Sequence, residues 1–105
     1  MHLTSYLDCG ILTIALTGEI DHHCAKSYIS AISSKIEAYT PNACILDFEE
    51  VTFMDSSGIA VIINSFRAMT RMDGILTIAG LREQPMKVVR TAGIDKIVKI
   101  EERVR

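Results

Sequence analysis

Residues 43–71 read ACILDFEEVTFMDSSGIAVIINSFRAMTR and join a strand pattern to a helix pattern. The first part, residues 43–53, opens with the mostly apolar run ACILDF, which is typical of a strand buried in a parallel or mixed sheet. From Ser56 to Arg71 the pattern favours a helix, and the Asp-Gly pair at 73–74 is a turn signal after it. A strand joined directly to a helix predicts an α/β protein.

The chain before this stretch predicts a hairpin followed by a helix. The runs 2–7 (HLTSYL) and 11–17 (ILTIALT) flank the turn DCG, whose glycine can take a positive φ. Further on, apolar residues recur at spacings of three and four, the signature of one helical face: Ala25, Tyr28 or Ile29, Ile32, Ile36 and Tyr39. The segment 40–42 (TPN) should end this helix.

The chain after the stretch predicts two strands and one helix. Residues 75–79 (ILTIA) indicate a strand, and a third helix opens at 83–85 (EQP) with proline in its first turn. Gly93 closes that helix, with the next residue folding back on its last turn. Residues 97–100 (IVKI) indicate a short final strand, and the charged tail 101–105 should fray.

The predicted order is therefore β-β-α-β-α-β-α-β in one domain, residues 1–105. Crossovers of this length favour an α/β fold with a mixed, largely parallel sheet and helices packed on it.

The composition excludes several classes of protein. Apolar residues make up 49% and charged residues 23% of the chain, which excludes a disordered protein. The net charge is −2 without a basic run, so neither nucleic acid nor a membrane is an expected partner. No apolar segment approaches the roughly 18 residues that cross a bilayer, and residues 1–16 lack the pattern of a signal peptide. We therefore expect a cytoplasmic protein with a protein partner.

The cysteines and histidines predict neither a disulfide framework nor a metal site. Cys9, Cys24 and Cys44 are odd in number and widely spaced, so we expect reduced structural thiols. His22 and His23 are adjacent, and consecutive residues on a helix point in different directions, so they should not share a metal ion. We expect both to be exposed in a first helical turn.

The join MDSSG, residues 54–58, holds more polar residues than a helix start needs. Asp55, Ser56 and Ser57 all belong to the types preferred at a helix N-cap. A cap requires only one of them, and Gly58 costs about 1 kcal/mol against alanine inside a helix. The excess favours a functional role over a cap alone.

A serine at a helix start is suited to phosphorylation, because the free N–H groups and the partial positive charge there tolerate a phosphate. On a serine in this segment the phosphate would add a charge of about −1.5 to −2, with Asp55 adjacent. A partner surface fitted to a neutral hydroxyl could not bury that charge, so binding would be switched off.

A second polar turn should lie beside the first. TGEIDHHCA, residues 17–25, links the second strand to the first helix, as VTFMDSSG, residues 51–58, links the third strand to the second helix. If those strands run parallel, both turns meet at the carboxyl edge of the sheet, and Asp21 and Ser56 become neighbours. An alternative role for Asp21 is the N-cap of the first helix.

Two enzymatic alternatives fit the pattern less well. A Ser56–His22–Asp21 relay would need the two turns to touch, and the chain lacks both the G-x-S-x-G elbow and a glycine-rich oxyanion segment. A phosphoaspartate receiver would need an acidic pair after the first strand to hold a divalent ion, and that pair is missing. We therefore expect no catalytic residues.

Three segments together resemble a known family. LTGEIDHHCA (16–25), LDFEEVTFMDSSGIAVI (46–62) and the GI pair at 93–94 look like the STAS domains of bacterial anti-sigma factor antagonists, in order and spacing over residues 1–100. Within that family, the doubled histidine is most similar to the antagonists of the sporulation anti-sigma F factor. The resemblance implies a STAS-type fold.

The resemblance also implies a regulatory protein that is not an enzyme and has no cofactor. In the family, the unphosphorylated protein binds an anti-sigma factor serine kinase and releases the sigma factor, and phosphorylation switches binding off. The kinase binds the ATP or ADP, and a serine phosphatase restores the hydroxyl. The phosphorylated serine falls on Ser56, and the partner-binding residues implied are those of the two turns: Asp21, His22, Asp55, Ser56, Ser57 and Gly58. We expect a monomer when the protein is free, and the alternative is a STAS module that scaffolds a signalling complex.

Overall fold

The described residues, 2–102 of the computed structural model, follow the predicted order of strands and helices. The strands are β1 His2–Asp8, β2 Ile11–Ile20, β3 Ala43–Met54, β4 Ile75–Ala79 and β5 Lys99–Glu101. The helices are α1 Ala25–Tyr39, α2 Ser56–Arg71 and α3 Glu83–Thr91, and a short 3₁₀ helix covers Ile94–Lys96. None of these helices is long and apolar enough to cross a membrane.

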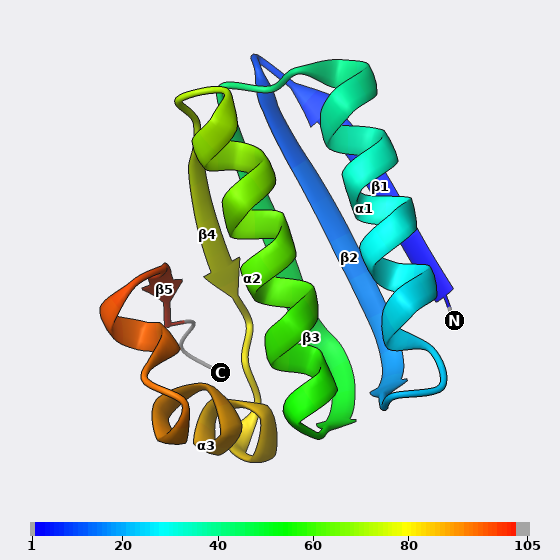
Figure 1. Cartoon of the computed structure of the whole chain (residues 1–105), viewed down its shortest axis with the longest axis vertical. Coiled ribbons are helices and arrows are strands. Elements are labelled where there is room, and N and C mark those ends of the chain that lie inside the picture. The colour runs from blue at the N-terminus through cyan, green and yellow to red at the C-terminus, as the bar shows by residue number, and fades with distance from the viewer. Residues whose placement is uncertain (1, 103–105) are drawn as a thin grey trace.

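The strands of residues 2–102 form one sheet in the order β1-β2-β3-β4-β5 (Figure 1). β1 runs antiparallel to β2, and every later pair of neighbours runs parallel. The mixed, largely parallel sheet predicted from the sequence is therefore confirmed. Because β2 and β3 point the same way, the turns that follow them emerge at the same edge of the sheet.

The hairpin of β1 and β2 closes through a two-residue loop, with Asp8 paired to Ile11. Cys9 has φ 51° and Gly10 has φ 78°, so both residues of the loop are left-handed. A turn with two left-handed residues matches the twist of an antiparallel pair, and glycine adopts that backbone without steric cost. The hairpin and the positive φ of its glycine are confirmed.

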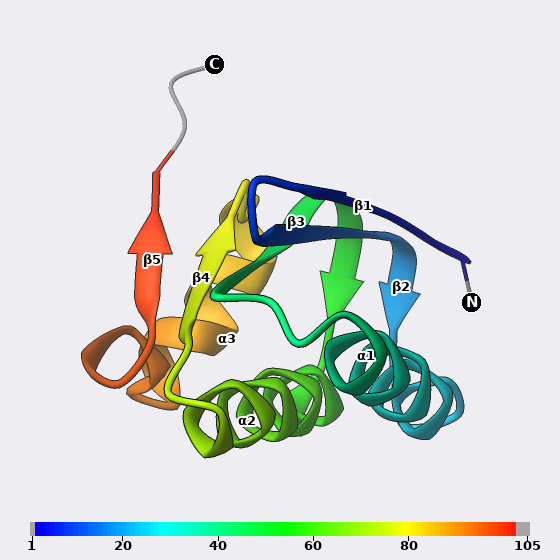
Figure 2. The ribbon, with the colours of Figure 1, turned by 90° about the horizontal axis from the view of Figure 1, so that it is seen from above.

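α1 and α2 lie side by side against one face of the sheet (Figure 2). The core between them and the sheet is built from alternate strand residues and from helix residues three or four apart. Its members are Leu12, Ile14, Leu16, Cys44, Leu46, Phe48, Leu76 and Ile78 of the strands, and Tyr28, Ile32, Ile36, Val61, Ile62 and Met69 of the helices. The predicted buried face of α1 is wrong at Tyr39, which is 48% exposed because it is the last residue of the helix.

The C-terminal segment follows its prediction only in part. Gly93 has φ 74° after α3, and Ile94 is buried, as predicted. The final strand begins at Lys99 and not at Ile97. The reason is that the amides of residues 97 and 98 both donate to the carbonyl oxygen of Ile94, at 2.9 Å each, and so remain part of a turn. The tail predicted to fray starts inside β5, and residues 103–105 lie outside the described part of the chain.

Candidate functional site

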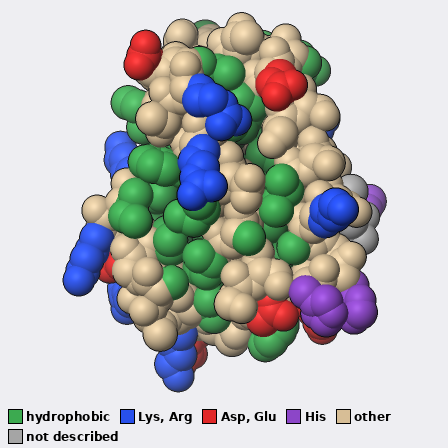
Figure 3. All heavy atoms as spheres, in the orientation of Figure 1, with side chains coloured by type: hydrophobic (Ala, Val, Ile, Leu, Met, Phe, Trp, Pro, Cys, Tyr) green, Lys and Arg blue, Asp and Glu red, His purple; other side chains and the backbone are tan. Residues whose placement is uncertain are grey.

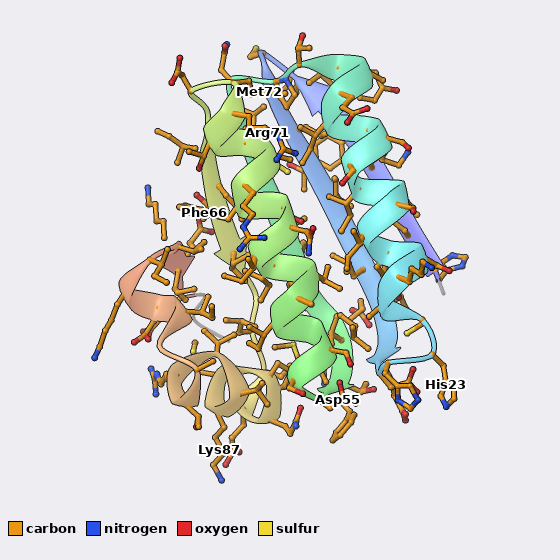
Figure 4. The ribbon with its side chains drawn as sticks, in the orientation of Figure 1. His23, Asp55, Phe66, Arg71, Met72 and Lys87 are labelled. Carbon is orange, nitrogen blue, oxygen red and sulfur yellow. The ribbon has the colours of Figure 1, made fainter. Side chains whose placement is uncertain are left out.

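The two polar turns meet at the carboxyl edge of the sheet, as the sequence predicted. In the parallel register Ile20, the last residue of β2, pairs with Met54, the last residue of β3. One residue further on, the amide of Asp55 donates to the carbonyl oxygen of Ile20, at 3.2 Å. Figure 4 shows Asp55 at the start of α2 and His23 in the neighbouring turn, at the same end of the molecule.

In the turn before α2, Asp55 is the N-cap. Its backbone is extended, and its carboxylate oxygen Oδ1 accepts from the amide of Ser57 at 2.7 Å. The amide of Gly58 donates to the carbonyl oxygen of Asp55 at 3.0 Å. Of the three possible caps in the sequence, the aspartate therefore takes the role. Ser56, the first residue of α2, keeps its side chain exposed.

Packing gives one reason why position 58 is a glycine, which the sequence did not reveal. A Cβ atom on Gly58 would lie 2.7 Å from Sδ and 3.1 Å from Cβ of Met54, which is closer than side-chain atoms pack. The residue is buried in the first turn of α2. Packing against the methionine beneath the helix is therefore one reason for a glycine here, and its part in partner binding stays a prediction.

The backbone of Met54 is bonded by the side chain of Gln84, in the first turn of α3. The amide of Met54 donates to Oε1 of Gln84 at 2.9 Å, and Nε2 of Gln84 donates to the carbonyl oxygen of Met54 at 2.8 Å. β4 pairs with β3 only as far as Asp47, so the last part of β3 lacks this strand as a neighbour. The amide side chain of Gln84 replaces it. Sequence reasoning missed Gln84, since no local spacing relates it to Met54.

The turn before α1 is built differently. Oδ1 of Asp21 accepts from the amides of His23, at 3.0 Å, and Cys24, at 3.2 Å. α1 begins only at Ala25, whose amide donates to the carbonyl oxygen of Asp21 at 3.0 Å. Asp21 therefore caps a separate turn over residues 22–24, and the prediction of an N-cap of the helix itself is corrected. The residue at the N-cap position, Cys24, makes no side-chain capping bond.

The charge of Asp21 is stabilised within this turn. Burial acts to raise the pKa of Asp21, but hydrogen bonds from Cys24 and His23 and the charge of His23 outweigh it and lower the pKa below 3.8. The carboxylate is therefore ionised at neutral pH. Oδ1 of Asp21 accepts two backbone amides, and among residues 2–102 no hydrogen bond joins the carboxylate to His22 as a Ser56–His22–Asp21 relay would require.

The two histidines lie against each other, contrary to the sequence prediction that they point apart. The ring centroids of His22 and His23 are 4.0 Å apart, with the planes tilted by 37°. The prediction assumed helical geometry, whereas both residues belong to the turn before α1, and both are exposed as predicted. Among residues 2–102, no group of three or more His, Cys, Asp or Glu side chains could hold a metal ion.

The three cysteines are free thiols in three different environments. Cys44 is buried in the core, and burial raises the pKa of its thiol to about 12. Cys24 is partly exposed, and its Sγ donates to the carbonyl oxygen of Glu19 at 3.3 Å. Cys9 lies exposed in the hairpin loop, so the prediction of a structural thiol does not describe it.

An apolar groove adjoins Ser56. It has a volume of about 310 Å³ and lies between α2 and α3, lined by Ser56, Ile59, Lys87, Val88, Thr91 and Ala92. Figure 3 shows hydrophobic side chains spread over α2 and toward α3, with the histidines at the lower right and an acidic side chain beside them. Sequence reasoning missed the groove, because two helices far apart in the chain form it. The edge thus brings together a hydroxyl, charged and imidazole groups, and an apolar groove.

The fold and the paired turns define an α/β protein with a candidate site at the carboxyl edge of a mixed sheet. The chain belongs to the STAS domain family, whose model matches residues 4–105.

Individual relatives share this architecture at low sequence identity. The anti-sigma F factor antagonist of Paenibacillus polymyxa is 25% identical over 91 residues, which cover 87% of this chain and 78% of that protein. The structure of an anti-sigma factor antagonist from Mycobacterium paratuberculosis superposes with a TM-score of 0.84 at 20% identity, covering 94% of this chain and 83% of that one. SpoIIAA of Bacillus in its phosphorylated form gives a TM-score of 0.75 at 23% identity, covering 99% and 93%.

Proposed function

We propose that this protein is an anti-sigma factor antagonist controlled by phosphorylation of Ser56. Unphosphorylated, it binds an anti-sigma factor serine kinase, and the sigma factor is released. The observation that carries the proposal is the exposed Ser56 side chain at the start of α2, beside the turn of Asp21. The names of its relatives support it, since one is an anti-sigma F factor antagonist and one is a structure in phosphorylated form.

Ser56 is suited to accept a phosphate because the helix does not depend on its side chain. Asp55 supplies the capping bond to the first turn, so modification of the neighbouring hydroxyl leaves that bond in place. The partial positive charge of the helix start favours the added anion. Ser57 is the poorer acceptor, because its side chain is less exposed than that of Ser56.

The phosphate would switch binding off through charge. It adds about −1.5 to −2 at neutral pH, next to the carboxylate of Asp55 and across the edge from that of Asp21. A partner that buries the neutral hydroxyl would have to desolvate the added charge beside two others of the same sign. Such a cost is large enough to abolish a moderately tight complex.

The partner-binding surface proposed here extends beyond the serine. Asp21 and His22 contribute an ionised carboxylate and an exposed ring from the neighbouring turn, and the groove between α2 and α3 accepts an apolar side chain. Gly58 acts through packing, because it is buried. The nucleotide belongs to the kinase, a phosphatase restores the hydroxyl, and this chain needs no cofactor of its own. The free protein is a monomer located in the cytoplasm.

Mass spectrometry after incubation with the anti-sigma factor kinase and ATP tests the proposal. We expect the intact mass to rise by one phosphate and peptide mapping to place it on Ser56. The matched controls are Ser56→Ala, which should gain no phosphate, and Ser57→Ala, which should gain one. Phosphate found mainly on Ser57 or on the serines of α1 would contradict the assignment. A scaffold module would bind its partner without being modified.

A further inference from the structure

We infer that Gln84 is a positioning residue for the phosphorylation of Ser56. It fixes the peptide groups of Met54 so that the first turn of α2 presents the serine hydroxyl in one orientation. The inference rests on the proposed function, because it names the residue that orients the phosphate acceptor.

The two hydrogen bonds between Gln84 and Met54 pair one side-chain amide with both backbone groups of one residue, at 2.9 and 2.8 Å. Met54 is fully buried, so its backbone groups need partners within the protein. The side-chain amide of Gln84 offers a donor and an acceptor together, which matches the two backbone groups of Met54. A carboxylate would keep the acceptor and lose the donor, and methionine would keep the volume and lose both.

Met54 transmits this constraint to the helix. Its side chain packs so closely under Gly58 that a Cβ there would lie 2.7 Å from its Sδ, and the next peptide is tied to β2 through the amide of Asp55 and the oxygen of Ile20. The residue before the cap is thus held by α3, by α2 and by β2. Ser56 follows two residues later, at the point where these constraints converge.

A neighbouring residue provides a matched control. Nε of Arg82 donates to the carbonyl oxygen of Glu49 at 2.7 Å, so it also ties the segment before α3 to β3, but five residues upstream of Met54. Arg82→Met and Gln84→Met each remove contacts between this segment and β3. They differ in whether the contact reaches the turn that carries Ser56.

Steady-state phosphorylation of the folded variants by the kinase separates positioning from stability. We expect Gln84→Met to lower kcat about tenfold or more with KM within about twofold, because small misplacement of a reacting group is costly while the docking surface is kept. Gln84→Glu should give a smaller loss of kcat, and Arg82→Met should leave kcat within about twofold. Equal kcat for Gln84→Met and the wild type would overturn the role of Gln84.

Hydrogen exchange by NMR gives a second readout that needs no kinase. The amides of Ser57 and Gly58 should exchange about tenfold faster in Gln84→Met than in Arg82→Met, because both bond to the cap residue Asp55. Unchanged exchange would also overturn the inference. If the wild-type protein is not phosphorylated on Ser56, the proposed function fails. If it is phosphorylated and the Gln84 variants behave like Arg82→Met, only the positioning role fails.

Discussion

The turns before α1 and α2 lie side by side and both begin with an aspartate, yet they are built in different ways. Asp55 caps its helix directly, whereas Asp21 caps a separate turn ahead of the helix. Three residues after the aspartate, one turn holds Gly58, with no room for a Cβ, and the other holds Cys24, with a partly exposed thiol.

The difference lies in what holds each turn. The turn of Asp55 is fixed by other elements, through the oxygen of Ile20 and the side chain of Gln84. The hydrogen bonds to the Asp21 side chain come from within its own turn, from the amides of His23 and Cys24. The turn that presents the hydroxyl of Ser56 is therefore bonded to other elements of the fold. The turn that presents the Asp21 carboxylate and the two histidine rings is held by bonds within itself.

The largest expected effect on stability comes from filling the tight position. Gly58→Val places new atoms against Met54, and overpacking a buried site costs about 1–3 kcal/mol. Cys24→Val, the matched change in the other turn, should alter the free energy of unfolding by less than about 1 kcal/mol, because that side chain is partly exposed. Urea denaturation of both variants measures the difference. Equal losses would show that the two turns are packed alike.

The next effect concerns binding. Ser56→Asp should bind the anti-sigma factor at least about tenfold more weakly than the wild type, a loss of about 1.4 kcal/mol or more, because the added charge must be desolvated beside Asp55. Ser56→Ala should bind like the unmodified protein and resist inactivation by the kinase. Calorimetric titration of both variants checks this.

Thermal melts of these two variants provide the control. Both should unfold within about 1 kcal/mol of the wild type, since Asp55 keeps the cap and a charge at the helix start is tolerated. Equal affinity of the two variants for the partner would mean that the MDSSG segment only caps the helix and does not switch binding.

The smallest expected effect is a pH dependence of folding stability that comes from Asp21. Because hydrogen bonds lower the pKa of Asp21 in the folded state, the ionised carboxylate adds stability above its ordinary pKa of 3.8, and this contribution is lost as the pH falls through the folded pKa. Asp21→Asn keeps an oxygen for the same amides and does not titrate. The difference in Tm between the two proteins should be constant above about pH 5 and shrink below 3.8. A difference independent of pH would contradict this account.

Local patterns predicted most of the fold and part of the site. The bounds of α2, Ser56–Arg71, and of β4, Ile75–Ala79, agree with the sequence prediction, because strong periodicity and turn residues mark their ends. The final strand was misplaced, since amides following Ile94 continue a turn that apolar content does not reveal. The histidine pair was misjudged because its backbone is a turn and not a helix.

The sequence by itself determined the order of elements, the parallel placement of the two turns and the start of a helix at Ser56. These follow from side-chain periodicity, capping chemistry and the rule that parallel strands end at one edge. Only the tertiary structure decided that the Gln84 side chain hydrogen-bonds to the backbone of Met54, that Gly58 leaves space for the Met54 side chain, and that α2 and α3 form a groove. Those contacts join residues distant in the chain, and no local spacing encodes which buried groups will meet once the sheet has formed.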